Sequence, residues 1–443
     1  MGMQPSPMEP HELWGSSQSP ERVHQDRTTI ANARIRRVQG VYAVISWYGF
    51  WIRLWKPTKK RELYISRTDQ QRQISACPTL STFLGPIPSA VPPIFTLSLP
   101  ATKDMGFSSI RSLALLWLVA TSVPVASGLP KTKCDSVPKC TELNQRQAWS
   151  ALTDDEKSRY IDAELCLQNR PAVLGIEGAK NRWDELMYGH IVQSNIIHDV
   201  GAFLPWHRLY MRAHEIILQT ECGYQGAQPY WDELADRTAG ELEAASVLDA
   251  DTGFGTGDVG EDGCIVNGPF VNLTMHLNQT SNEANYCLSR KLASWAWDWA
   301  NSTWLDACYA TDNYEDAWQC FIFAPHTAGH GSIGGTMLDV VASPGDPLFF
   351  LHHTYLDRVW WRWQQQDLPT RLTDMSGRNI PLQTYLDQNN FDYPSTAVTD
   401  YFNDGGNETT LSHTLWMAGL MPNATIGDVM DLGGDLICAE YIG

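Results

Sequence analysis

Histidine placement is the feature that most restricts how this 443-residue chain can fold. Ten of its twelve histidines follow Met105, and six of these stand in segments with a helical pattern. The six form two triplets, which are His190, His198 and His207, and then His326, His330 and one of the adjacent pair His352 and His353. Facing helices of a bundle can present such imidazoles to a shared interior.

Helix geometry decides which of these rings can meet. The stretch HTAGH puts His326 and His330 four residues apart, so their rings lie on one helix face, about 40° apart. His352 and His353 are neighbours in a helix expected over 346–366 and are rotated by about 100°. We therefore expect one of the two rings to face the site and the other to face elsewhere.

The remaining pattern is mainly α. Helices are expected over 144–168, where Thr153 begins a capping sequence, and over 181–195, which carries His190. A further helix is expected over 201–223, with a proline near its first turn, a glycine at its end and His207 near its start. Residues 232–290 are rich in Gly, Asp and Asn and predict long loops, and the tail ends in a short strand-like segment.

The residue types of the two triplets indicate a metal site. Neither cysteine nor acidic residues accompany the histidines as a cysteine-rich zinc site or a carboxylate-rich iron site would require. Imidazole ligation suits copper, zinc or iron, and a binuclear site with six histidines favours copper. The HExxH pattern of zinc proteases is absent, because HTAGH lacks the glutamate. Three other histidines are interpreted as ordinary surface or hydrogen-bonded residues, and these are His214, His276 and His413.

Charge divides the chain near Met105. Residues 1–104 hold 13 lysines and arginines against 7 acidic residues, whereas the rest holds 19 against 43. Residues 105–128 have a basic start, a short apolar core and small residues before Gly128, as a secretory signal peptide does. We interpret 1–104 as a doubtful extension from an over-extended gene model; the alternative is a real basic extension with an internal apolar helix. The net charge of −18 argues against nucleic acid or an anionic membrane as a partner.

Cysteines and glycosylation sequons also indicate export. Nine of the ten cysteines follow the expected signal peptide and none form a CxxC pair, which favours disulfides with at least one cysteine left free or intermolecular. Five sequons follow Met105, at Asn272, Asn278, Asn301, Asn407 and Asn423. The expected localisation is therefore the secretory pathway, with no membrane span in the mature protein.

Two long segments resemble a known family. The segments HDVGAFLPWHRLYMRAHE and DPLFFLHHTYLDRVWWRWQ are similar to the copper A and copper B signatures of tyrosinases, type 3 copper proteins related to catechol oxidases and haemocyanins. The resemblance covers roughly 134–443, so 129–443 is expected to be one tyrosinase copper-binding domain. It implies a four-helix bundle that holds two copper ions, with long loops and a few short strands.

The resemblance also assigns the ligands. Copper A would be held by His190, His198 and His207, and copper B by His326, His330 and His353. His352 would then face away from the site. Asp357, one turn after His353, could accept a hydrogen bond from a ligand imidazole, or be an ordinary helix-end charge. Phe349, one turn before His353, could wall the site, and core packing is a compatible interpretation.

Some positions depart from the family pattern. Many tyrosinases have asparagine after the first copper B histidine, where this chain has Thr327. In those enzymes the asparagine and an upstream glutamate hold a water that deprotonates the phenol. Glu315 is a candidate for that glutamate, although its spacing differs. Ile196 stands where several tyrosinases have a cysteine crosslinked to a copper A histidine. The chain resembles the short secreted fungal type, which has no C-terminal lid domain.

The resemblance implies a secreted copper oxidase that uses O₂ to oxidise phenols or o-diphenols to quinones. Oxidation of o-diphenols is a firmer expectation than hydroxylation of monophenols, because of Thr327. The substrate would be a small phenol of a secondary-metabolite or pigment pathway, or a tyrosine in a peptide. The alternative is a dioxygen-binding protein of haemocyanin type without turnover, or a copper protein with a closed site. The sequence does not determine the substrate or the oligomeric state.

Overall fold

The structure is a computed structural model that describes residues 42–45, 52–55 and 139–443 apart from 396–401 and 405. Contacts divide the chain into two units, residues 1–118 and 119–443. In the first unit, β1 (Tyr42–Ile45) pairs antiparallel with β2 (Ile52–Trp55). The predicted signal peptide at 105–128 lies outside the described residues, as does most of the predicted extension.

The second unit is built mainly of helices, as predicted. Its described helices are α1 (Asp154–Asn169), α2 (Arg182–Ile191), α3 (Ser194–Ile197), α4 (Phe203–Glu221), α5 (Glu233–Ala239), α6 (Ser294–Trp297), α7 (Ser302–Tyr309), α8 (Tyr314–Phe323), α9 (Pro325–Ile333), α10 (Leu348–Gln365), α11 (Gln383–Gln388) and α13 (Ile426–Val429). A long segment with the short strands β4 and β5 connects α5 to α6.

The strands of this unit are short and pair only two at a time. Its described strands are β3 (Asn144–Arg146), β4 (Thr274–Met275), β5 (Tyr286–Cys287), β6 (Thr414–Leu415), β7 (Ala424–Thr425) and β8 (Ala439–Tyr441). The β3–β8 pair is parallel, while β4–β5 and β6–β7 are antiparallel. The β3–β8 pair therefore joins the beginning and the end of this unit.

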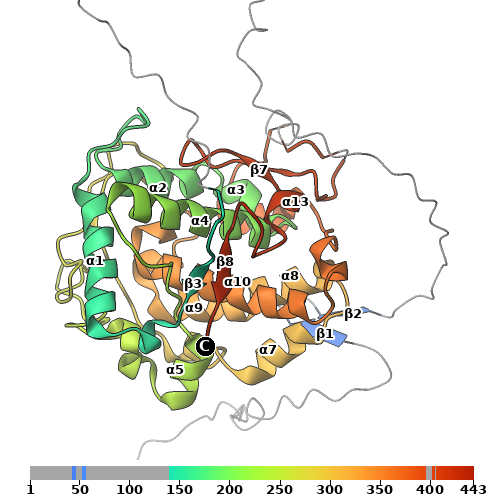
Figure 1. Cartoon of the computed structure of the whole chain (residues 1–443), viewed down its shortest axis with the longest axis horizontal. Helices are drawn as coiled ribbons and strands as arrows, with labels where there is room; N and C mark the ends of the chain where they lie inside the picture. Colours follow the sequence, from blue (N-terminus) through green and yellow to red (C-terminus); the bar gives the residue numbers. More distant parts are fainter. Residues whose placement is uncertain (1–41, 46–51, 56–138, 396–401, 405) are drawn as a thin grey trace, which may run out of the picture. The chain divides into compact units, whose positions relative to one another are not determined.

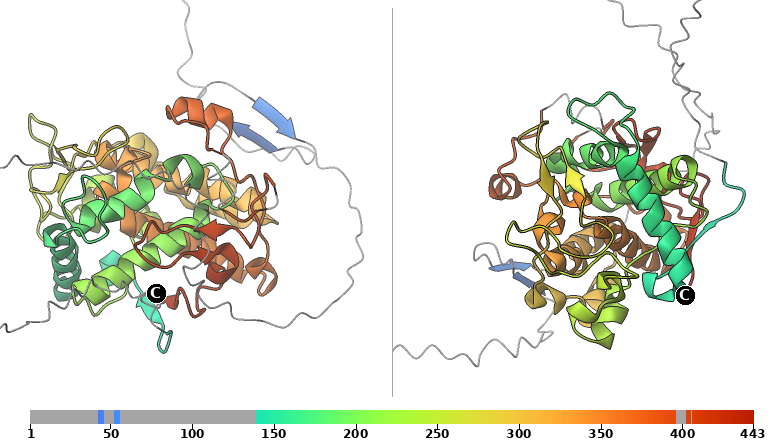
Figure 2. Two further views of the ribbon diagram at one scale, coloured as in Figure 1. Left: turned by 90° about the horizontal axis from the view of Figure 1, so that it is seen from above. Right: turned by 90° about the vertical axis from the view of Figure 1, so that its left-hand side faces the viewer.

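Four helices, α2, α4, α9 and α10, form the bundle that carries the site histidines other than His198, which directly follows α3 (Figures 1 and 2). Helix α10 packs against both α4 and α9, and the Tyr210 hydroxyl of α4 donates to the Leu186 carbonyl of α2 at 2.7 Å. Helix α1 covers α2 and α4 from outside. Apolar residues on these helices, such as Trp183, Leu209 and Trp360, are fully buried and form the core.

Local sequence signals explain where these helices begin and end. Thr153 and Glu156 form a reciprocal capping box at α1, and Asn181 with Asp184 forms one at α2. Helix α9 starts with a proline, which is suited to this position because the first N–H groups of a helix have no partner within the helix, so the N–H that proline lacks is not needed there. Gly334 ends α9 in a left-handed conformation with φ 65°, which costs little for a residue without Cβ.

Two predicted segments differ from the observed elements. The helix predicted over 144–168 begins only at Asp154, because residues 144–146 form β3 and satisfy their backbone groups by pairing with β8. The segment 181–195 is divided, since α2 ends at Ile191 and a separate turn, α3, follows. The predicted helices over 201–223 and 346–366 agree with α4 and α10 to within about two residues at each end.

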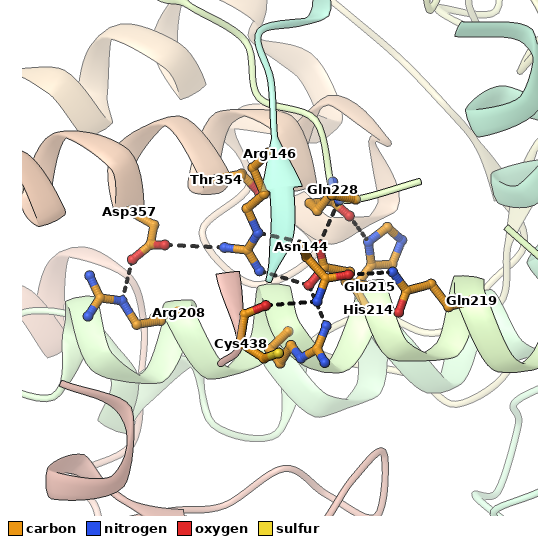
Figure 3. Close-up of polar contacts among 12 residues, drawn as sticks. Asn144, Arg146, Arg208, His214, Glu215, Gln219, Gln228, Thr354, Asp357 and Cys438 are labelled. Carbon is orange, nitrogen blue, oxygen red and sulfur yellow. Dashed lines mark hydrogen bonds and ion pairs between the residues drawn. The ribbon is translucent and has the colours of Figure 1, made fainter. Parts of the chain in front are cut away.

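A buried polar network joins β3, α4 and α10 (Figure 3). Arg146 of β3 donates to Glu215 of α4 at 3.0 Å and to Asp357 of α10 at 3.3 Å. Arg208 of α4 also donates to Asp357, and the hydroxyl of Tyr441 in β8 does the same. Because buried charges need partners, this network fixes α4 and α10 relative to each other. These two helices carry His207 and His353.

Disulfides fasten the loops and the ends of the unit. All eight cysteines within the described residues are paired, as Cys140–Cys438, Cys166–Cys222, Cys264–Cys287 and Cys308–Cys320. Cys140–Cys438 spans 298 residues of sequence and lies beside the β3–β8 pair. Cys77 and Cys134 lie outside the described residues. Among the described helices, none is long and apolar enough to cross a membrane.

Candidate metal centre

Three histidines from α2, the end of α3 and α4 form one buried group, called site A and consisting of His190, His198 and His207. Their ring centroids lie 4.9 to 5.8 Å apart. Each ring places Nδ1 against a backbone carbonyl, at distances of 2.8 to 3.0 Å. A carbonyl only accepts, so each Nδ1 carries the proton and each Nε2 keeps its lone pair.

Four histidines from α9 and α10 form the second group, called site B and consisting of His326, His330, His352 and His353. One nitrogen from each ring lies within 4.8 Å of one from every other ring. His330 donates through Nδ1 to the Met337 carbonyl, and its Nε2 lies 3.1 Å from Nε2 of His353. The i, i+4 pair of α9 therefore converges with α10 as the spacing predicted.

Sites A and B are adjacent. The rings of His207 and His353 stack with centroids 4.2 Å apart and planes at 11°. Phe349 lies between the two sites, with its ring 5.3 Å from His190 and 4.2 Å from His353. Phe203 contacts His207 at 4.7 Å and His326 at 4.9 Å. Two fully buried phenylalanine rings therefore pack against both groups.

Burial keeps these imidazoles neutral. Removal from water lowers the pKa of His198 to about 4 and that of His352 to about 3. The pKa values of His190, His207, His326, His330 and His353 are also lowered, first by burial and then by the neighbouring imidazoles. At neutral pH all seven rings are therefore neutral, each with one nitrogen that carries no proton, which is the state that a metal ion requires.

The free nitrogens fit a pair of metal ions. Nε2 of His190, His207 and His326 is buried and has no hydrogen-bond partner among the described residues. A buried polar atom without a partner costs about 1–3 kcal/mol, so several together in one place indicate a missing group. Neutral imidazole nitrogens are suitable ligands for copper. The carbonyls that hold Nδ1 supply the outer contacts by which metal-bound histidines are usually oriented.

The adjacent pair on α10 differs from expectation, because His352 does not face away from the site. Its ring lies 4.6 Å from that of His330 and 5.7 Å from that of His326. Helix α9 crosses α10 here at Gly329, where the missing side chain leaves room for the His352 ring. A ring rotated by about 100° from its neighbour can therefore still reach the site.

Glu233 is a site residue that the sequence analysis did not identify. It is the first residue of α5, is only 1% exposed, and pairs through Oε1 with Nδ1 of His352. Burial raises the pKa of Glu233 well above its usual value, and the nearby Asp232 and Asp236 act in the same direction. The segment PYWDELAD contained no signal that separated this glutamate from its exposed acidic neighbours.

Glu315 and Thr327 do not contact the histidines in the described structure. Glu315 is exposed in the first turn of α8, about 12 Å along the helix axis from the end nearest α9. Thr327 is half-buried, and its hydroxyl lies 3.5 Å from the Ile322 carbonyl, to which it donates. The position of α8 thus removes Glu315 from the centre.

Asp357 likewise accepts from groups other than a ligand imidazole. Its carboxylate is occupied by Arg146, Arg208 and Tyr441. Two guanidinium groups attract a buried carboxylate more strongly than a neutral imidazole N–H does. Asp357 therefore orients helix α10 rather than the His353 ring.

The three histidines interpreted as ordinary lie outside sites A and B. His214 stacks on Phe350 and bonds Glu164 at 3.1 Å. His276 bonds Asp184 at 2.9 Å, and His413 bonds Asp404. Each is satisfied by a carboxylate that belongs to the surrounding fold.

Comparison with known proteins gives consistent results. The family model for the common central domain of tyrosinase matches residues 180–366, which contain both histidine groups. Tyrosinase P of Aspergillus terreus is 31% identical over 324 residues, which cover 62% of this chain and 87% of that protein. The N-acetyl-6-hydroxytryptophan oxidase of Emericella nidulans is 30% identical over 363 residues, covering 69% of this chain and 94% of that protein.

A solved structure shares the same arrangement of helices. A polyphenol oxidase from Thermothelomyces thermophila superposes with a TM-score of 0.56 at 26% identity. The superposition covers 69% of this chain and 91% of that one. The helical bundle described above is thus similar to that of a polyphenol oxidase.

Proposed function

Because the chain belongs to the tyrosinase family of copper proteins, we propose that it is a secreted oxidase that uses O₂ to convert o-diphenols to quinones. The family supplies the copper-dependent oxidoreductase class. The observation that carries the finer proposal is the pair of adjacent, buried imidazole groups with unpartnered Nε2 atoms.

We assign six histidines to two copper ions, with His190, His198 and His207 for copper A, and His326, His330 and His353 for copper B. When bound, such a pair of copper ions would bind O₂ and accept two electrons from the substrate. The 3.1 Å between the Nε2 atoms of His330 and His353 supports their sharing an ion, since two nitrogens about 2.0 Å from one ion lie about 3 Å apart.

The protein itself orients the ligand imidazoles and limits the access of water to them. Backbone carbonyls at Nδ1 hold the rings of His190, His198, His207 and His330 with Nε2 free. Phe203 and Phe349 exclude water, which keeps the imidazoles neutral. His326 is half-buried whereas the other five assigned ligands are buried, so we place the approach of substrate on the side of His326.

The proposed substrate is a small phenol, or a tyrosine in a peptide, consumed in secondary-metabolite or pigment formation. One relative is named for its oxidation of a hydroxylated tryptophan derivative, which supports a small hydroxylated aromatic ring. We propose oxidation of o-diphenols rather than hydroxylation of monophenols, because Glu315 is exposed and the Thr327 hydroxyl bonds a backbone carbonyl, so neither of these two residues acts as a base at the centre.

Export is part of the proposal. The four disulfides support an oxidising compartment. The five sequon asparagines are all exposed or half-buried, which leaves them accessible to glycosylation. Sequencing the N-terminus of the secreted protein tests this point, with a start close after residue 128 expected. A mature protein that begins before residue 105 would contradict it.

The central experiment measures copper and oxygen uptake on the purified full chain. About two coppers per chain and oxygen uptake with catechol are expected, with slower or no uptake with phenol. Absence of copper, or copper without uptake, would refute the proposal. Reversible O₂ binding without turnover of catechol would instead identify a dioxygen carrier.

A further inference from the structure

The Glu233 carboxyl is the one acidic group among the described residues that contacts site B. It is 1% exposed, and its hydrogen-bonding partner is Nδ1 of His352. Its Oε2 is buried and has no hydrogen-bond partner among the described residues. No arginine or lysine in the described part of the chain forms an ion pair with it, so this carboxyl is not part of a structural salt bridge.

The absence of a side chain on Gly329 makes room for the pair of Glu233 and His352. Gly329 lies on α9 between His326 and His330, and a Cβ at this position would lie 2.0 Å from Nδ1 of His352. The same Cβ would lie 2.7 Å from Oε1 of Glu233. The pair therefore occupies the volume of the missing side chain and is fixed against the helix that carries two proposed copper ligands.

Site B has one more imidazole than a three-ligand site needs. His352 lies within the same 4.8 Å group as the three proposed ligands, and its Nε2 is buried without a partner. Glu233 occupies Nδ1 of His352, so only Nε2 is left to reach an ion, and a neutral imidazole this close competes with His353 unless the direction of that nitrogen is fixed. His353 has no hydrogen bond at Nδ1 among the described residues, so its ring is held less firmly than that of His352.

We propose that Glu233 is a positioning residue that holds His352 beside copper B but off the ion, so that His353 completes the site. The inference rests on the proposed ligand assignment. Loss of the carboxyl would free the His352 ring to rotate and compete with His353. Glu233 thus acts through His352, by a contact between α5 and α10.

The chain offers a matched control in a second buried pair of the same kind. Glu164 and His214 are bonded at 3.1 Å, with both side chains 0% exposed, and they lie outside both histidine groups. Glu164→Ala removes a carboxyl from a buried histidine just as Glu233→Ala does. It should lower stability without changing metal binding.

The test is a titration of the metal-free full chain with Co²⁺, whose visible spectrum reports the number and geometry of its ligands. Wild type and Glu233→Gln, which keeps a hydrogen-bonding group, should bind two ions with the same spectrum. Glu233→Ala should weaken the second ion by about 10–100-fold and change its spectrum. Glu164→Ala should match the wild-type spectrum.

A double variant decides whether the effect passes through His352. In a His352→Phe background, Glu233→Ala should cause no further change, because the competing ring is gone; His352→Asn replaces it if the Phe variant does not fold. A second ion bound with wild-type affinity in Glu233→Ala would overturn the inference. So would a defect that persists unchanged without His352, which would make Glu233 act directly on the metal.

The outcomes separate this inference from the proposed function. If wild type binds two ions and oxidises catechol while Glu233→Ala is unchanged, only the positioning role fails. If the Co²⁺ results agree with the inference but the copper protein does not oxidise catechol, only the proposed oxidase activity fails.

Discussion

Sites A and B contain the same ligand type but are held by different parts of the fold. In site A, the rings of His198 and His207 bond carbonyls four residues earlier in their own segments. In site B, only His330 bonds a nearby carbonyl, and His352 depends on Glu233, 119 residues away. The third ring of site A, His190, bonds the Val341 carbonyl, 151 residues away. Two of the three rings of site A are therefore held by local backbone, whereas site B depends on how α5, α9 and α10 pack.

The largest expected effect comes from removing one ligand from each site. His207→Ala and His353→Ala should each leave about one copper per chain and reduce oxygen uptake with catechol to background, because the proposed reaction needs both ions. His352→Ala should keep two coppers. Metal analysis and an oxygen electrode give the measurement, and retention of two coppers by His353→Ala with loss in His352→Ala would reverse the ligand assignment.

The variant Gly329→Ala tests whether site B can be disturbed without disturbing site A. The added Cβ would lie 2.0 Å from the His352 ring, so site B must shift while site A is untouched. We expect loss of one copper and of catechol oxidation. Gly240→Ala is the matched control, because nothing lies within 4 Å of its added Cβ. Two coppers and normal activity in Gly329→Ala would show that site B adapts more freely than proposed.

Breaking the polar network should affect both sites together. Arg146→Met leaves the buried carboxylates of Glu215 and Asp357 without one cation and should lower the free energy of unfolding by about 3–5 kcal/mol. The control is the ion pair between half-buried Arg237 and exposed Asp298, and Arg237→Met should cost about 1 kcal/mol or less. Urea unfolding of the metal-free chain measures both. An equal decrease in the free energy of unfolding in the two variants would show that the buried network stabilises the protein no more than the Arg237–Asp298 pair does.

The smallest effect is a pH dependence of the metal-free protein. The pKa of His198 is lowered to about 4, so between pH 6.5 and 4 the unfolded chain binds a proton that the folded chain does not. Stability should therefore fall as the pH falls through this window, by at most about 1.4 kcal/mol per pH unit from this ring. For His352 the window extends to about pH 3. His198→Asn and His352→Asn should each flatten the profile, and unchanged slopes would contradict the burial of these rings.

Sequence patterns predicted the helices that carry the histidines because those signals are local. Apolar periodicity and start and stop residues identified α4 and α10, and the i, i+4 spacing of His326 and His330 implied a shared face. The pattern failed at 144–146, where pairing with β8, almost 300 residues away, replaced the helix. No window of sequence contains that partner.

For the candidate site, too, local features could be predicted from the sequence and long-range contacts could not. The sequence by itself identified the histidines that gather in sites A and B and the resemblance to tyrosinases, because residue type and spacing are written along the chain. The prediction of a second triplet was incomplete, since both His352 and His353 lie in site B. Only the tertiary structure decided that Asp357 serves two arginines, that Glu315 lies on the surface, and that Glu233 reaches His352. A side chain's burial and partner depend on the packing of distant segments, and for Glu233 that packing turns one acidic residue among several into part of the metal centre.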